Sequence, residues 1–73
     1  AMSENHEILK KHSVVISGHQ TSVTLENIFW ENLKIVAKSE GKSLKALITE
    51  IDKGRTTNLS SAIRVYILKK LSD

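Results

Sequence analysis

The sequence contains no cysteine, and this absence excludes two kinds of structure. A chain without cysteine has neither a disulfide framework nor a zinc site with thiolate ligands. It also fits a reducing compartment such as the cytoplasm. Any stability that the fold needs must therefore come from packing, polar contacts or association.

Long apolar runs and secretion signals are absent as well. No run approaches the roughly 18 residues of a membrane-spanning helix, and the start shows no signal-peptide pattern. We expect Ala1 to be a cloning remnant that precedes a native start at Met2. At 73 residues the chain is expected to form one domain. A domain this small buries only about 60% of its unfolded surface, so oligomerisation would relieve its marginal stability.

Patterns typical of enzymes and metal sites are also missing. The chain has no glycine-rich phosphate loop, no nucleophile beside a base motif, and too few residues to enclose a pocket. Its three histidines are six and seven residues apart and have no cysteine partners: His6, His12 and His19. We therefore expect no catalysis, no cofactor and no native metal site.

The charge that is present is modestly basic. Eleven lysines and arginines stand against eight acidic residues, which gives a net charge of +3. The excess lies in the second half of the chain, whereas Lys10 and Lys11 end a polar stretch at the start. Such a balance permits phosphate binding without establishing it.

One short stretch, residues 20–25, alternates polar and apolar side chains and runs straight into a helical pattern. Alternation with a period of two predicts a half-buried β-strand. A single strand cannot satisfy its backbone groups against helices, and an open edge invites pairing with another chain. We therefore expect this strand to pair with the same segment of a second copy.

The residues before this strand are harder to assign. Residues 13–17 have β-branched character, but their apolar positions are out of phase with those of residues 20–25. We expect Gly18 to form a bulge or bend that switches the face of the strand; a tight hairpin about Gly18 and His19 is the alternative. Residues 1–12 are polar without periodicity, so they are expected to form a flexible arm, with residues 13–73 as the domain.

Three helical segments follow. The first is expected over residues 26–40, with Gly41 just past its end, and the second begins after Ser43 and stops at Gly54. The third follows Asn58 as a cap. Its apolar residues are too many to lie on a single face of the helix: Leu59, Ala62, Ile63, Val65, Tyr66, Ile67, Leu68 and Leu71. We therefore place this helix at the heart of a dimer interface.

The order of strand, helix, glycine-containing turn and helix resembles the ribbon-helix-helix family of DNA-binding dimers, which includes Arc-type and methionine-type repressors. Residues 18–26, 29–30 and 58–65 look like a small, mostly uncharacterised bacterial subgroup found largely in alphaproteobacteria. The resemblance covers residues 13–68. It implies a mainly α homodimer with one β-strand per chain, an intermolecular antiparallel β-ribbon and an additional short helix.

Two segments are candidates for the counterpart of the second helix of the family. Either residues 43–52 or residues 59–71 could fill this place. The Ser-Ala-Ile-Arg string at residues 61–64 favours the later helix.

The resemblance also implies which strand residues read DNA. In the family, the ribbon residues that face away from the core enter the major groove. Val23 and Leu25 match the inward positions, so Gln20, Ser22 and Thr24 match the base-reading ones. A glutamine amide can pair bidentately with adenine, and a hydroxyl can donate or accept at several bases. Many relatives place arginine or lysine here, whereas none of these three residues is basic.

Phosphate anchoring is expected at a helix N-terminus, where free N–H groups and the helix dipole favour an anion. Two places qualify. The start of the third helix offers Asn58, Leu59 and Ser60 with Arg55 nearby, and the start of the second offers Ser43 with Lys42 and Lys45. The first matches the resemblance better, and Lys10 and Lys11 could add sequence-independent contacts from the arm.

The sequence thus predicts a sequence-specific DNA-binding homodimer, a transcriptional regulator of the bacterial cytoplasm and nucleoid that binds a palindromic duplex. The alternative is a dimeric protein-interaction module, antitoxin-like or adaptor-like, with weak or no DNA binding. A helix-turn-helix is less consistent, because residues 54–58 are long for its turn. The expected dimer interface comprises Val23, Leu25, Trp30, Ile63, Tyr66 and Ile67.

Overall fold

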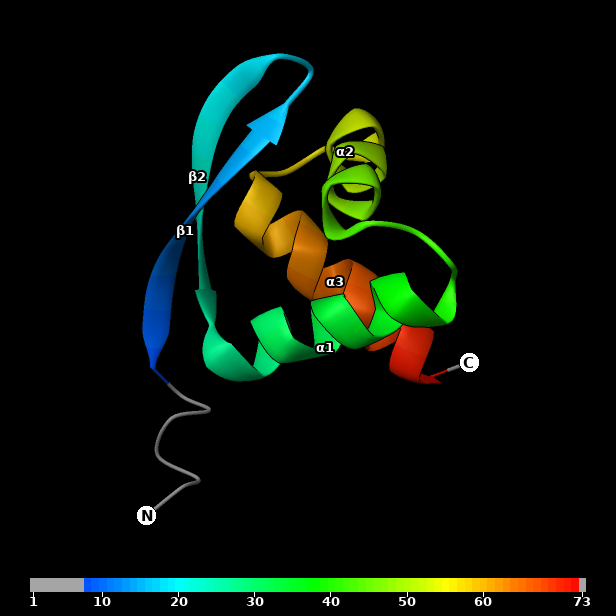
Figure 1. The fold of residues 1–73 in the computed structure, drawn as a ribbon. Coiled ribbons are helices and arrows are strands. Elements are labelled where there is room, and N and C mark those ends of the chain that lie inside the picture. The colour runs from blue at the N-terminus through cyan, green and yellow to red at the C-terminus, as the bar shows by residue number, and fades with distance from the viewer. Residues whose placement is uncertain (1–7, 73) are drawn as a thin grey trace.

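The computed structural model describes residues 8–72, which form two antiparallel strands followed by three helices (Figure 1). The elements are β1 (Leu9–Ile16), β2 (His19–Glu26), α1 (Asn27–Ser39), α2 (Leu44–Gly54) and α3 (Leu59–Ser72). All three helices were predicted, and the two expected side-chain caps are present. Ser43 Oγ accepts a hydrogen bond from the Ala46 N–H at 3.0 Å, and Asn58 Oδ1 accepts one from the Ser61 N–H at 2.9 Å.

The partner of β2 is β1 of the same chain. The pairing runs from Ile16 opposite His19 to Leu9 opposite Glu26. The prediction of a single strand that pairs with a second copy is therefore wrong, and the alternative of a tight hairpin is correct. Residues 9–12, which were assigned to a flexible arm, belong to β1; residues 1–7 of that arm lie outside the described residues.

A two-residue turn explains why the sequence pattern was misleading. Ser17 and Gly18 have φ angles of 52° and 82°, as a type I′ turn requires at both central positions. In this hairpin every even-numbered residue lies opposite an odd-numbered one. Val14 and Val23 therefore share a face of the sheet, although they differ in phase along the sequence. The alternation of apolar residues changes phase at Gly18 because the chain turns there in a hairpin rather than in a bulge.

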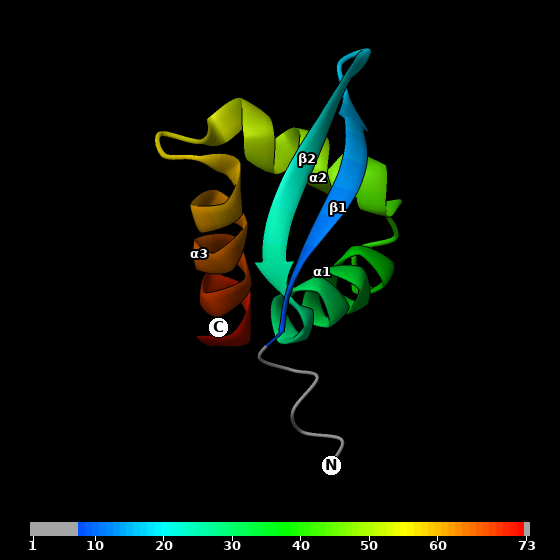
Figure 2. The same ribbon diagram turned by 90° about the vertical axis from the view of Figure 1, so that its left-hand side faces the viewer.

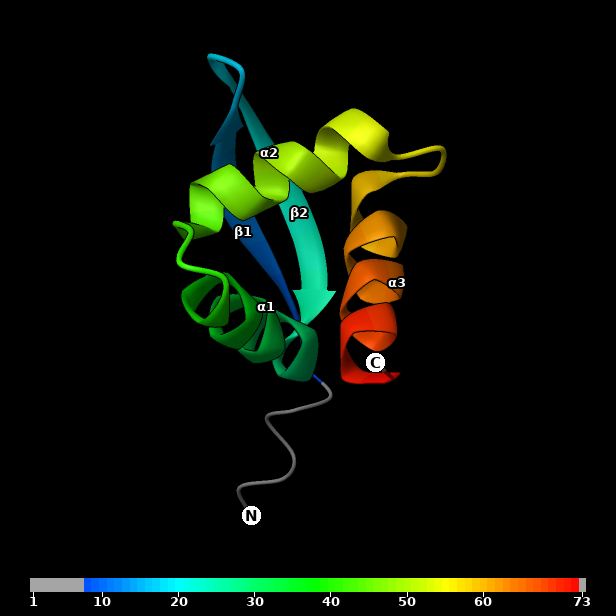
Figure 3. The ribbon, with the colours of Figure 1, turned by 90° about the vertical axis from the view of Figure 1, so that its right-hand side faces the viewer.

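The inner face of the hairpin packs on the helices and forms a single core. Figure 3 shows α2 crossing the hairpin, with α1 below it, and Figure 2 shows α3 beside β2. The core contains Ile16, Val23, Leu25, Leu33, Val36, Ala37, Leu47, Ile48, Ile51, Ile63 and Ile67. Since the core includes both strands, the position of the outer face of the hairpin is fixed relative to all three helices.

We expect Gly18→Ala to destabilise the protein by roughly 1–2 kcal/mol, because an L-residue is strained at a φ of 82°. An added Cβ would meet no atom within 4 Å, so the cost is one of backbone conformation alone. Gly54→Ala is the matched control: Gly54 ends α2, its Cβ would also be free of contacts, and alanine should stabilise by about 0.5 kcal/mol. Urea denaturation of both variants measures the difference. Equal effects at the two glycines would contradict the assigned turn.

Candidate nucleic-acid interface

The outer face of the hairpin carries the three residues that were expected to read bases. Gln20, Ser22 and Thr24 are all exposed on β2, on the side away from the core residues Val23 and Leu25. The strand alternation thus places these side chains together on one accessible surface. The alternation in the sequence thus predicted correctly which residues of β2 face away from the core.

The other half of this outer face comes from β1. Lys11 lies opposite Thr24, Ser13 opposite Ser22, and Val15 opposite Gln20. Residues that face each other across a sheet point to the same side, so both strands build the surface. We call these six residues the outer hairpin face. The contribution of β1 was not predicted, because residues 9–12 show no alternation of apolar residues.

Lys11 supplies the basic group that β2 lacks. It was expected to sit in a flexible arm, whereas the structure holds it in a strand, exposed to solvent. Within residues 8–72 its ammonium group has no acidic partner. The charge is therefore free to meet an anion or a base edge.

The beginning of α3 lies beside the hairpin. An open hollow of about 270 Å³ joins hairpin residues to the loop between α2 and α3. Its lining comprises Ile16, Ser17, His19, Thr21, Ser22, Asp52, Arg55 and Leu59. Of the two helix N-termini predicted to hold phosphate, the start of α3 thus lies near the hairpin through Leu59, whereas Ser22 is the one residue of the outer side of β2 that lines this hollow.

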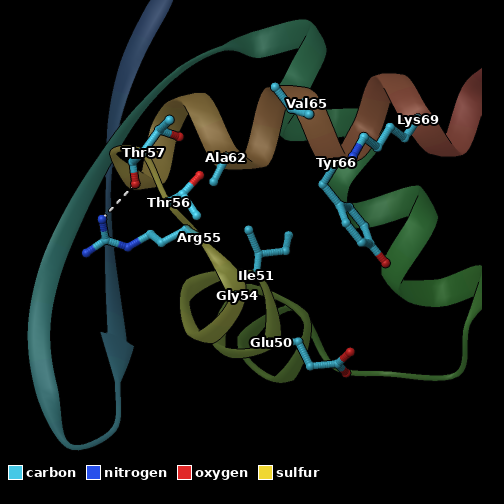
Figure 4. Close-up of a pocket in the computed structure, with 10 residues that line it drawn as sticks. All are labelled: Glu50, Ile51, Gly54, Arg55, Thr56, Thr57, Ala62, Val65, Tyr66 and Lys69. Atoms are coloured by element: carbon cyan, nitrogen blue, oxygen red, sulfur yellow. Dashed lines mark hydrogen bonds between the residues drawn. The ribbon is translucent and has the colours of Figure 1, made fainter.

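Arg55 is fixed in this hollow by two hydrogen bonds. Its Nε donates to Asp52 Oδ1 at 2.7 Å, and its Nη1 donates to the Thr57 carbonyl at 2.8 Å. Figure 4 shows the side chain extending from the loop toward the hairpin. An arginine has five N–H donors, so three remain for an external acceptor. The first-turn N–H groups of Leu59 and Ser60 also have no acceptor within α3.

The other predicted phosphate site has a structural role instead. Lys42 Nζ lies 2.6 Å from Glu50 Oε2 and 3.3 Å from Glu40 Oε1. The hydrogen bond to Glu50 raises the pKa of Lys42 above its usual value. Glu40 also accepts hydrogen bonds from the Tyr66 hydroxyl and pairs with Lys70 at 2.9 Å. These contacts link the end of α1 to residues of α2 and α3.

Lys45 has no such partner among residues 8–72, but it lies away from the hairpin. It is exposed on the first turn of α2 and does not line the hollow beside the hairpin. The structure therefore brings Leu59 and Arg55 to the hairpin, with Asn58 and Ser60 on either side of Leu59, and neither Lys42 nor Lys45 lines the hollow.

The comparisons identify the family of this fold. A family model described as a ribbon-helix-helix domain matches residues 9–71. This chain belongs to the ribbon-helix-helix family. The match begins at the first residue of β1, so it extends beyond the residues 13–68 on which the resemblance rested. Ribbon-helix-helix domains in general form dimers and bind DNA.

A solved structure has a similar fold. An uncharacterized protein from Bordetella pertussis Tohama I matches with a TM-score of 0.81 and 27% sequence identity. The match covers 94% of this chain and 60% of that one, so this chain spans little more than half the length of its structural relative. A search of curated proteins finds no match.

Four residues expected at the dimer interface are already covered within one ribbon-helix-helix chain. Val23, Leu25, Ile63 and Ile67 are at most 1% exposed. A side chain without accessible surface has none to give to a second copy, so these four pack the core of their own chain. The exposed apolar residues of α3 are instead Val65, Leu68 and Leu71. Apolar residues lie around most of the circumference of α3 mainly because β2, α1 and α2 pack against different sides of this helix.

Trp30 and Tyr66, the other two expected interface residues, are half-buried and have partners in the chain. The Tyr66 hydroxyl lies 3.2 Å from Glu40 Oε2. The Trp30 indole stacks on the His12 ring, with centroids 3.7 Å apart and an interplanar angle of 5°. His12 Nε2 is buried without a hydrogen-bond partner. Burial is the main cause that lowers the pKa of His12, and the charges of Lys10 and Lys34 lower it further.

A second hollow, of about 390 Å³, lies between α2 and α3, with Tyr66 and Lys69 at the end away from Arg55 (Figure 4). It contains a single carboxylate, that of Glu50. Within residues 8–72, no three His, Cys, Asp or Glu side chains are grouped so that they could hold a metal ion. None of the described helices is both long enough and apolar enough to span a membrane.

The stacked His12 predicts that acid destabilises the fold. Because the folded chain lowers the pKa of His12 below the value of about 6.5 in an unfolded chain, the unfolded state binds more protons as the pH falls. The free energy of unfolding should therefore decrease from about pH 6.5 downward. Urea denaturation followed by Trp30 fluorescence at about pH 7.5 and 5.5 measures this loss. His12→Phe keeps an aromatic ring and should reduce the loss; an unchanged loss would contradict the assignment to His12.

Proposed function

We propose that this ribbon-helix-helix protein is a sequence-specific DNA-binding transcriptional regulator whose hairpin enters the major groove. The observation that carries the proposal is the outer hairpin face, whose exposed polar side chains belong to the same hairpin that Arg55 and Leu59 approach at the start of α3. Base-reading groups and phosphate-binding groups thus lie on neighbouring elements. Direct readout requires this combination, because phosphate contacts orient a protein and base contacts select the sequence.

The outer hairpin face fits the chemistry of the major groove. That groove is about 12 Å wide and admits a two-stranded β-ribbon. The Gln20 amide can pair with N6 and N7 of adenine, and the hydroxyls of Ser22 and Thr24 can donate to or accept from several bases. These side chains are accessible to a base edge, since all three are exposed.

The phosphate backbone would be held at the start of α3. The free N–H groups of Leu59 and Ser60 and the helix dipole favour an anion there. Arg55 adds a full positive charge whose orientation is fixed by Asp52 and Thr57. A phosphate bound in this place would set the register of the hairpin in the groove.

The protein is proposed to act as a homodimer, as domains of this family generally do. Because β2 pairs with β1 of its own chain, each copy would bring a complete hairpin to one half of a palindromic site. A two-fold dimer places equivalent surfaces on equivalent half-sites.

A second candidate is a dimeric protein-interaction module, antitoxin-like or adaptor-like, with little affinity for DNA. The exposed Val65, Leu68 and Leu71 on α3 favour it, because these apolar side chains are not covered within the described chain. The small basic excess also favours it. The two candidates differ in one measurable property, which is specific affinity for duplex DNA.

Selection from a randomised duplex pool, followed by fluorescence anisotropy at several salt concentrations, tests the proposal. We expect one enriched sequence, with affinity that falls steeply as salt rises. Gln20→Ala should cost about 1–3 kcal/mol at one base pair and relax the preference there. Arg55→Ala should weaken binding to every sequence. It should also make the slope of the logarithm of the binding constant against the logarithm of the salt concentration shallower by about 1.

Lys38→Ala is the control for charge, since Lys38 is exposed on the last turn of α1, away from the hairpin (Figure 1). It should leave affinity and salt slope nearly unchanged. Circular dichroism would confirm that each variant is folded. No binding at low salt by the folded protein would reject the DNA-binding function and favour the interaction module.

A further inference from the structure

We propose that a groove along α3 is a docking site for a partner protein, which binds through an amphipathic helix with acidic flanks. The residues that line the groove come from α2, α3 and the loop between them, and none of them belongs to the hairpin. The inference goes beyond the proposed DNA-binding function and does not depend on it.

Two hollows join to form the groove. One is the hollow of about 390 Å³ between α2 and α3, and the other, of about 370 Å³, follows the last turns of α3. Val65 and Lys69 line both hollows, so the groove is continuous from the loop after α2 to Ser72. Figure 4 shows Val65 and Lys69 on α3, with Glu50 across the first hollow on α2.

The α3 wall of the groove has the spacing of one helix face. It includes a row of residues at intervals of three and four positions: Ala62, Val65, Lys69 and Ser72. Such a row forms a ridge that packs into the surface of a second helix. It spans about 15 Å along the helix axis, which is about three turns of a partner helix. The shape of this wall therefore favours a helical occupant.

Apolar side chains on the outer side of α3 are open to solvent. Val65, Leu68 and Leu71 are 49%, 53% and 63% exposed, whereas the core residues Ile63 and Ile67 are at most 1% exposed. Neighbouring apolar residues that remain exposed, with polar residues around them, are typical of protein-binding surfaces. An amphipathic helix covers such residues with apolar anchors at positions i, i+3, i+4 and i+7. The phosphate backbone of DNA has no comparable apolar surface, so this side of α3 is suited to a protein.

The charge of α3 indicates the chemistry of the partner. The helix contains three basic residues, Arg64, Lys69 and Lys70, and no acidic residue. Arg64 pairs with Glu26 and Lys70 pairs with Glu40, both at 2.9 Å. Within residues 8–72, Lys69 has no acidic partner, although it lines both hollows. Its ammonium group is therefore available to a carboxylate of a bound helix.

The other charged residues that line the groove are already paired. Glu50 Oε2 lies 2.6 Å from Lys42 Nζ, and Arg55, at the end of the groove, pairs with Asp52 at 2.7 Å. The groove thus combines exposed apolar side chains with one unpaired positive charge. A helix with apolar residues on one face and glutamate or aspartate beside them complements both features.

A second copy of this chain is a poorer occupant for the same reason. An isologous pair of α3 helices would bring two unpaired Lys69 side chains into one interface. Since α3 has no acidic residue, neither helix offers a carboxylate to the other. Like charges at close range oppose association. We therefore assign the groove to a different protein.

Fluorescence anisotropy with the full-length chain and a labelled peptide tests the inference. The probe is a stapled helical peptide of about 14 residues with leucines on one face and glutamates along both flanks. The staple is needed because isolated helices of this length are marginal in water. The matched control peptide has lysines in place of the glutamates. We expect the acidic peptide to bind at least about tenfold more tightly than the basic one.

Three variants assign the binding to the groove. Lys69→Glu should weaken binding of the acidic peptide roughly fivefold and strengthen binding of the basic peptide, a gain that misfolding cannot produce. Leu68→Ser should weaken binding of the acidic peptide roughly tenfold, because an apolar contact is lost. Lys38→Glu is the control of equal charge change on α1 and should alter either affinity by less than about twofold. All three residues are exposed, so circular dichroism should show each variant folded.

NMR spectra of the labelled chain locate the peptide. The acidic peptide should shift the amide signals of Val65, Leu68 and Lys69 and leave those of Gln20 and Ser22 in place. Equal affinity for the two peptides, or shifts confined to other elements, would overturn the inference. A homodimer that Leu68→Ser dissociates in sedimentation experiments would also overturn it, since a second copy would then occupy the groove. Wild type and Leu68→Ser should select the same duplex, because the groove contains no hairpin residue; a lost base preference would contradict the assignment to a protein partner.

Discussion

The left-handed turn at Ser17 and Gly18 is the constraint on which the rest of the structure depends. Two consecutive residues with positive φ reverse the chain within two positions and so set the register of the whole hairpin. This register turns Ile16 and Val23 toward the core and Lys11 and Gln20 toward solvent. A shift of one residue would exchange the faces of β1. The turn thus determines both the core and the surface proposed to meet DNA.

Much of this architecture could be predicted from local signals. The Ser43 and Asn58 caps, Gly41 after the first helix and Gly54 at the end of the second marked the helices, because these signals act within one turn of chain. The alternation of β2 predicted its outward residues for the same reason. The resemblance supplied the ribbon-helix-helix family, which the family match confirms, whereas the one strand per chain that it implied is a two-stranded hairpin in the structure.

The misassigned features depend on contacts between distant segments. Residues 9–12 have no alternation of apolar residues, and their strand conformation depends on pairing with residues 23–26. The apolar residues of α3 were predicted to be buried against a second copy, whereas three elements of the same chain cover Ile63 and Ile67. Similarly, Arg55 and the start of α3 join the hairpin only through tertiary packing.

Isotope-filtered NMR of an equal mixture of labelled and unlabelled protein tests the intrachain ribbon most directly. Non-hydrogen-bonded pairs bring Hα atoms close together, so Ser13–Ser22 and Lys11–Thr24 should show strong Hα–Hα contacts. The structure predicts that these contacts arise within labelled chains and vanish from the filtered spectrum, which detects contacts between labelled and unlabelled chains. Strong Ser13–Ser22 contacts in the filtered spectrum would show that the ribbon is shared between two copies and would contradict the account.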